Sequence, residues 1–154
     1  MDFLAALSSP EASLWGLFLS SFLAATLLPG GSEAVLFGVL QLHPAQIVPA
    51  MLLATLGNTL GGMTTYAMGR LIPKKVGAGD TAATAHFTEK HAAALERWGP
   101  ALLLMAWAPV VGDALCAAAG WLRLPWLPCT LWMAAGKAAR YGGVVLLAAQ
   151  FNGS

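Results

Sequence analysis

Four charged residues lie within segments that are otherwise strongly apolar: Glu33, Asp113, Lys137 and Arg140. A charge at the centre of a bilayer costs at least about 2.5 kcal/mol, so such residues usually face the interior of a helix bundle and pair with one another. Two acids and two bases can form a neutral buried set. The set predicts either a transport site or simple cross-links between helices, and a side chain as long as Arg140 can also reach the membrane interface.

Both carboxyl groups close a helix-breaking segment, which is 29–33 for Glu33 and 109–113 for Asp113. Proline lacks a backbone N–H and glycine favours non-helical backbone, so one helix should end and another begin at each segment. We expect Ser32 or Glu33 to cap the first new helix and Asp113 to cap the second. The N-terminus of a helix carries a partial positive charge and can hold an anion such as phosphate.

These positions predict a division of roles. Glu33 and Asp113 would be the proton-titrating groups, because a carboxyl group withdrawn from water holds its proton more readily. The predicted substrate-binding side chains, which would hold an anionic headgroup, are Ser32, Asn58, Arg123, Lys137 and Arg140.

No catalytic, metal or cofactor site is expected, so the chain is not predicted to be an enzyme. Residues 30–34 lack the closing glycine of a nucleophile elbow, and neither a P-loop nor a dinucleotide fingerprint occurs. His86 and His91 are five positions apart, which places them about 140° apart around a helix of 3.6 residues per turn. They therefore do not form a metal-binding pair on one face.

The composition explains why these charges stand out. The 154 residues are 58% hydrophobic and 10% charged, with a net charge of +1 and a mean hydropathy of +0.69. Ordinary soluble domains are about 45–50% apolar and about 25% charged. This excludes a soluble enzyme, a disordered tail and a nucleic-acid binder, since a nucleic-acid binder needs a basic surface. Cys116 and Cys129 lie in apolar runs and are expected to be buried thiols.

The amino terminus is expected to belong to the mature protein. It is apolar, but it carries Asp2 and Glu11 where a secretory signal would have positive charge.

Apolar runs and breaks predict an all-α integral membrane protein that forms a single membrane domain over residues 1–154. Its expected parts are a first re-entrant hairpin (12–42), a transmembrane helix (45–69), a cytoplasmic loop with a surface helix (70–98), a second re-entrant hairpin (99–123) and a transmembrane helix (125–149). The alternative is that each broken segment is a kinked helix that crosses the bilayer completely. Paired interrupted segments in two halves are typical of inverted-repeat transporters.

The middle loop sets the orientation. No Lys or Arg precedes Arg70, and the next positive charges follow within residues 74–97, so the positive-inside rule makes this loop cytoplasmic and both termini lie on the far side. Asp80 or Thr81 can cap a helix that runs to about Trp98. This helix is expected to lie on the membrane surface, with a solvated connector as the alternative.

A small-residue face follows in the first transmembrane segment, where Gly57-x-x-x-Gly61 permits close helix packing. Packing is the favoured interpretation over a substrate-lining role. Asn58, which lies in the same stretch, can hydrogen-bond to a hairpin tip.

Three strings together resemble one family: LLPGGSEAVL, GNTLGGMTTYAMGR, and WAPVVGDALCAAAGWLRLPW followed by GKAARY. They are similar to the DedA family, and more narrowly to its short YqaA-type branch within the VTT or SNARE-associated Golgi protein superfamily. The resemblance covers about residues 14 to 145. It implies a multi-pass bacterial inner-membrane protein with two facing re-entrant hairpins, in a family linked to moving phospholipids or polyprenyl phosphate and to the proton-motive force.

Single residues carry over from the family's motifs. The family's acidic residue after its first Pro-Gly turn corresponds to Glu33, and its arginine after the second hairpin corresponds to Arg123. The main branch has arginines around the second tip proline, whereas this chain has Ala106 and Gly112 there. That departure puts the main branch's substrate in doubt, and Lys137 and Arg140 can supply the missing positive charge.

The predicted function is proton-coupled movement of an anionic lipid, either a phospholipid or polyprenyl phosphate, across the bacterial inner membrane. The alternatives are a proton or cation exchanger, and a membrane scaffold or assembly factor that transports nothing. Membrane lipids are the expected partners, nucleic acid is not, and a homodimer is a further expectation because the chain is short.

Overall fold

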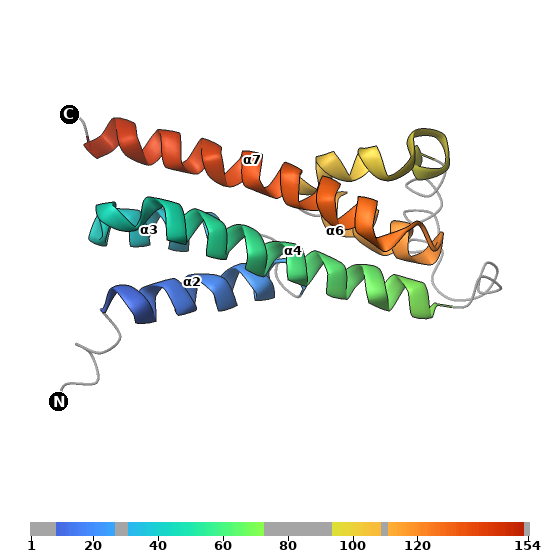
Figure 1. Cartoon of the computed structure of the whole chain (residues 1–154), viewed down its shortest axis with the longest axis horizontal. Helices are drawn as coiled ribbons and strands as arrows, with labels where there is room; N and C mark the ends of the chain where they lie inside the picture. Colours follow the sequence, from blue (N-terminus) through green and yellow to red (C-terminus); the bar gives the residue numbers. More distant parts are fainter. Residues whose placement is uncertain (1–8, 27–30, 73–93, 109–110, 153–154) are drawn as a thin grey trace. The chain divides into compact units, whose positions relative to one another are not determined.

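The computed structural model describes residues 9–26, 31–72, 94–108 and 111–152. Within those ranges every regular element is helical, and no strand occurs, which confirms the all-α class there. Figure 1 traces the elements in chain order. They are α2 (Pro10–Ala24), α3 (Ser32–Leu42), η1 (Pro44–Gln46), α4 (Ile47–Leu71), η2 (Gly99–Trp107), α6 (Val111–Trp121) and α7 (Trp126–Asn152).

The first broken segment forms two helices that pack on each other, α2 and α3. Helix α2 begins where Ser9 caps it, because the Ser9 side chain accepts a hydrogen bond from the backbone N–H of Ala12, and Pro10 fits the first turn, where no N–H partner is needed. It ends at Ala24, and α3 starts after Gly31. The helix is thus interrupted near Pro29, as predicted, although residues 27–30 lie outside the described ranges.

The second broken segment also consists of two packed limbs, η2 and α6. The first limb is a 3₁₀-helix of 9 residues, where the sequence suggested an ordinary α-helical limb. It ends at Trp107, and Ala108 is extended (φ −74°, ψ 128°), the conformation that a following proline imposes. Residues 109–110 lie outside the described part of the chain.

The limbs are short compared with a bilayer. Helices α3 and α6 have 11 residues each. Eleven residues make a helix only about 16 Å long, against a hydrocarbon core of about 30 Å. The paired short limbs favour the hairpin interpretation over complete crossings, although re-entry into the membrane and the inverted repeat stay predictions.

One helical stretch in the described ranges, Pro44–Leu71, is long and apolar enough to cross a bilayer by length and composition. Its outward side carries an exposed apolar stripe at helical spacing, formed by Val48, Leu52, Leu56 and Leu60, which is suited to lipid contact. Helix α7 is also continuous, with 27 residues, but it does not meet the same test of apolarity. Its spanning therefore stays a prediction.

The predicted surface helix falls mostly on residues 73–93, which lie outside the described ranges. Its end, residues 94–98, is helical.

The chain divides into two compact units. Unit 1 comprises Met1–Gly61 and Ala138–Ser154, and unit 2 comprises Gly62–Lys137. Helices α4 and α7 contribute a part to each. The core of unit 1 is built on Leu17, Leu36, Val39, Leu40, Ala50, Ala54, Tyr141 and Ala148. The core of unit 2 includes Tyr66, Leu95, Leu103, Leu115, Cys116, Cys129 and Met133.

Close helix contacts in unit 1 depend on the predicted glycine pair. A Cβ atom added at Gly57 would meet the carbonyl oxygen of Phe18, and one at Gly61 would meet Phe22 and Ala25. The packing role of Gly57-x-x-x-Gly61 is thereby confirmed, because α2 and α4 could not approach so closely if either residue had a side chain.

Glycines also permit close helix packing in unit 2. A Cβ atom at Gly69 would meet the backbone of Ala117, and one at Gly120 would meet the backbone carbonyl of Tyr66. The C-terminal part of α4 and α6 therefore touch backbone to backbone.

Candidate functional site

Helix α3 begins at Ser32, and Gly31 is its N-cap, with a φ of 110° that glycine adopts without strain. No side chain caps this helix. The expectation that Ser32 or Glu33 would do so is wrong, because both are already inside the first turn and their side chains are engaged elsewhere.

Glu33 forms an ion pair with Arg140 of α7, joining its carboxylate oxygen Oε1 to the guanidinium nitrogen Nη2. The two side chains are only 28% and 17% exposed, so the pair is largely withdrawn from solvent. Glu33 also lies in the first turn of α3, where the helix dipole favours negative charge. The carboxylate is thus held by a guanidinium and a helix N-terminus together.

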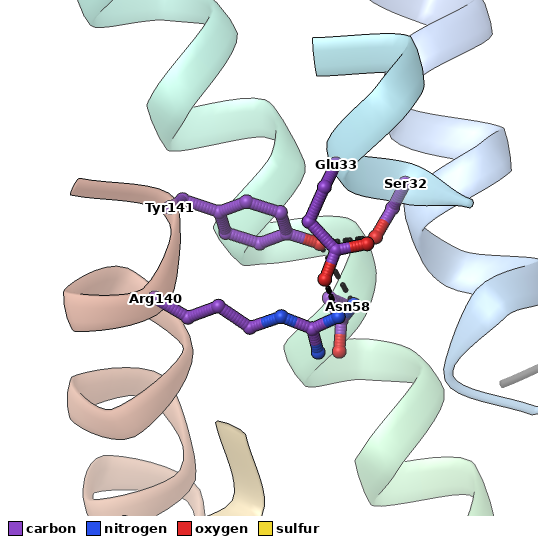
Figure 2. Close-up of polar contacts among 5 residues, drawn as sticks. All are labelled: Ser32, Glu33, Asn58, Arg140 and Tyr141. Carbon is purple, nitrogen blue, oxygen red and sulfur yellow. Dashed lines mark hydrogen bonds and ion pairs between the residues drawn. The ribbon is translucent and has the colours of Figure 1, made fainter. Parts of the chain in front are cut away.

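Tyr141 connects three helices next to this ion pair (Figure 2). Its hydroxyl accepts a hydrogen bond of 2.7 Å from Asn58 Nδ2 on α4 and donates one of 3.0 Å to Ser32 Oγ on α3. Tyr141, Ser32 and Asn58 are all buried. Because an unpaired polar group costs free energy in an apolar interior, the three groups fix one another's positions.

The grouping has a clear chemical capacity. It combines a guanidinium, two hydroxyl groups, an amide and the positive end of α3, which are all suited to an anion's oxygens. In this structure the guanidinium of Arg140 is paired with the carboxylate of Glu33. If Glu33 were neutralised, Arg140 would be able to bind another anion.

Two further hydroxyl groups in unit 1, those of Ser21 and Thr59, are buried and have no hydrogen-bond partner within the ranges that the structure describes. Buried polar groups normally have a partner, which can be an ordered water. Unit 1 therefore has polar capacity beyond the network around Tyr141.

The other acid and base of the predicted set lie in unit 2. Asp113, in the first turn of α6, and Lys137 of α7 are close enough to interact electrostatically. Lys137 is only 1% exposed. A Cβ atom at Gly62 would lie 2.9 Å from its Nζ, so that glycine leaves room for the ammonium group. A cation so deeply buried requires a compensating charge, which Asp113 can provide.

Arg123 belongs to neither set and lies in the connection between α6 and α7. It lines a cavity of unit 2 together with Arg70 at the end of α4. The sequence predicted Arg123 as a substrate-binding residue.

The structure thus groups Ser32, Glu33, Asn58 and Arg140 in unit 1, and Asp113 with Lys137 in unit 2. Sequence reasoning missed Tyr141 as a member of the first group. The available signal was a tyrosine within an apolar helix, since its hydroxyl needs a partner when it is buried. In the described part of the chain, no three His, Cys, Asp or Glu side chains gather as a metal site would require.

The chain is similar to known proteins over most of its length. The family model of the VTT domain matches residues 28–150. The chain is 44% identical over 145 residues to the inner membrane protein YqaA of Escherichia coli K12, covering 92% of this chain and 95% of that protein, and YqaA of Shigella flexneri matches equally. A Haemophilus influenzae protein is 38% identical over 152 residues, covering 90% of this chain and 89% of its own. No solved structure matches the chain.

Proposed function

The chain belongs to the VTT domain family, and we propose that it moves a phosphate-bearing anionic lipid across the bacterial inner membrane together with protons. The name of its YqaA relatives, inner membrane protein, supports that location. The observation that carries the proposal is the ion pair between Glu33 and Arg140 at the start of α3.

The proposed mechanism is a competition for Arg140. When Glu33 is ionised, its carboxylate occupies the guanidinium and no anion binds. When Glu33 takes up a proton, the pair is lost, and the guanidinium binds the phosphate of a lipid in a bidentate manner. Release of the proton would restore the pair and expel the phosphate, so lipid binding and proton binding are coupled through one residue.

The hydrogen bonds around Tyr141 would support the bound phosphate. The Ser32 hydroxyl can donate to a phosphate oxygen, and the Tyr141 hydroxyl, held by Asn58, keeps Ser32 in position. The free N–H groups in the first turn of α3 would add further donors. Asp113 and Lys137 would form the corresponding pair in unit 2, with Asp113 as the second proton-titrating group.

The test is a flux measurement in proteoliposomes. Liposomes contain a fluorescent phosphatidic acid, and a quencher added outside reports how much of it becomes accessible, with and without a pH gradient. The intact chain should accelerate lipid movement and respond to the gradient. Glu33→Gln should abolish the response to the gradient, and Arg140→Gln should abolish movement.

The control variant is Arg97→Gln, which removes an exposed arginine that stacks on Trp98 and takes no part in the network. It should move lipid as the intact chain does. A pH-sensitive dye in the same vesicles measures proton flux. Proton flux with added cations but no lipid movement would indicate an exchanger instead, and neither flux would indicate a scaffold; either result contradicts the proposal.

A further inference from the structure

A hollow in unit 2 is lined by residues that the mechanism above does not use. It has a volume of about 540 Å³, within the usual range for pockets that bind small molecules. Its walls are formed by Met63, Tyr66, Ala67, Arg70, Leu71 and Arg123. The α4 residues among them recur at the spacing of one helix face, so a single side of α4 forms most of the wall.

The two arginines of this cavity are held on one framework. Arg70 Nη1 donates a hydrogen bond of 3.0 Å to the hydroxyl of Tyr66, and that hydroxyl donates to the backbone carbonyl of Leu124. Leu124 directly follows Arg123. The buried Tyr66 therefore ties the end of α4 to the turn that carries Arg123, and the Arg70 guanidinium is held at the cavity wall.

The backbone at Arg123 is unusual for its residue type. Its φ is 57°, and in the described ranges it is the one non-glycine residue with a positive φ. The N–H of Leu124 donates to the carbonyl of Ala119 and the N–H of Arg123 donates to that of Gly120, the two hydrogen bonds of a Schellman turn. Glycine normally occupies this position, and another residue costs about 1 kcal/mol or more there. The turn itself therefore does not call for an arginine, since glycine adopts this backbone conformation without strain.

Neither guanidinium is neutralised within the ranges that the structure describes. The ion pair found there is the one between Glu33 and Arg140, and Arg70 contacts the uncharged Tyr66. The remaining lining side chains, Met63, Ala67 and Leu71, are apolar. The cavity thus combines two positive charges with an apolar wall, which is the complement of an anionic headgroup attached to a hydrocarbon chain.

We propose that the cavity between Arg70 and Arg123 is a second lipid site, which binds a phosphate-bearing headgroup through both guanidiniums and its hydrocarbon chain along the apolar face of α4. Two planar guanidiniums can each form paired hydrogen bonds to phosphate oxygens. Binding here does not depend on transport, so this proposal and the proposed function can fail separately.

A competing explanation is that the arginines merely neutralise the negative ends of α4 and α6, near which they lie. Lysine would serve that purpose equally well. It would not reproduce the paired hydrogen bonds to phosphate. The comparison between arginine and lysine therefore separates the two explanations.

The experiment measures lipid binding to the full chain in a neutral detergent by native mass spectrometry. The probes are phosphatidic acid, phosphatidylcholine and inorganic phosphate. We expect phosphatidic acid to bind best, since it has a phosphate monoester and an apolar chain. Arg70→Lys and Arg123→Lys should each weaken its binding about tenfold, the loss expected for a charged hydrogen bond.

Arg123→Gly is the sharpest variant, because glycine suits the backbone at this turn. It should raise or preserve the thermal unfolding temperature while weakening phosphatidic acid binding by about tenfold or more. Arg97→Gln is the matched control and should leave binding unchanged. Unchanged binding in Arg123→Gly and both lysine variants would overturn the proposal. Equal binding of phosphatidylcholine would also overturn it, and inorganic phosphate binding as tightly as phosphatidic acid would exclude the lipid assignment.

Discussion

Asn58 and Tyr141 are 83 positions apart in the sequence, yet a hydrogen bond of 2.7 Å joins Asn58 Nδ2 to the Tyr141 hydroxyl in the interior of unit 1. The same hydroxyl donates to Ser32 at the start of α3. One buried phenol therefore links α3, α4 and α7 at the point where Glu33 meets Arg140 (Figure 2).

Removing this hydroxyl should destabilise the protein. In Tyr141→Phe, Asn58 and Ser32 lose their shared partner, and an unsatisfied buried polar group costs about 1 to 3 kcal/mol. Thermal unfolding in detergent, followed by circular dichroism, measures the change. Asn58→Leu combined with Tyr141→Phe should cost less than the sum of the single changes, because fewer polar groups are left unpaired. Strictly additive effects would show that the two residues are not coupled.

The ion pair should behave as a coupled unit. Glu33→Gln or Arg140→Gln alone leaves one charge unpaired in a poorly solvated place. The free energy of unfolding should fall by about 1 to 3 kcal/mol, since breaking an exposed pair costs about 1 kcal/mol and breaking a buried pair costs about 3 kcal/mol. The double variant should regain part of that stability, since no unpaired charge remains. The unfolding free energies of the intact chain and of all three variants, measured in detergent, form a double-mutant cycle. A double variant less stable than both single ones would contradict the pairing.

Replacing the tightly packed glycines of α4 by alanine should lower the stability, whereas replacing a glycine with open space around it should not. Gly57→Ala and Gly61→Ala push a Cβ atom into the backbone of α2, and such overpacking costs about 1 to 3 kcal/mol. The matched control is Gly38→Ala in the middle of α3, where no atom lies within 4 Å of the added Cβ. That control should be neutral or stabilise by up to about 1 kcal/mol, because alanine is the better helix former. Equal unfolding temperatures for Gly57→Ala and Gly38→Ala would be inconsistent with this contact.

The two cysteines should react slowly with maleimides in the folded protein, because the side chains of Cys116 and Cys129 are fully buried. Both should react after unfolding in dodecyl sulfate. The control is Glu96→Cys, an exposed position in the predicted cytoplasmic segment, which should react at once. Rapid labelling of the native protein, measured by mass, would show that unit 2 opens.

Membrane orientation can be tested in cells with a variant lacking both cysteines. Glu11→Cys and Gln150→Cys should be labelled by an impermeant reagent from outside the inner membrane, and Leu71→Cys should be protected. This follows from same-side termini and a cytoplasmic middle loop. Labelling of positions 11 and 150 from opposite sides would overturn the predicted layout.

Local sequence signals predicted where several helices are interrupted and where two helices approach closely. Proline and glycine act on their own residues and nearest neighbours, so Pro29 and Pro109 predicted where helices are interrupted, and the spacing of Gly57 and Gly61 predicted a close helix contact. The sequence motifs Tyr66-x-x-Gly69-Arg70 and those around Glu33 and Asp113 predicted the family. The predicted cap of α3 was wrong, because the N-cap residue is glycine at position 31 and no side chain at 32 or 33 caps the helix.

The sequence alone determined that Glu33, Asp113, Lys137 and Arg140 are charged groups within apolar helices. Only the tertiary structure decided which acid meets which base, that Tyr141 joins Ser32 across 109 positions, and that Arg123 shares a cavity with Arg70. The physical reason is that helix ends depend on backbone preferences a few residues long. Pairings between distant side chains depend on how whole helices pack and rotate against one another, which no local pattern encodes.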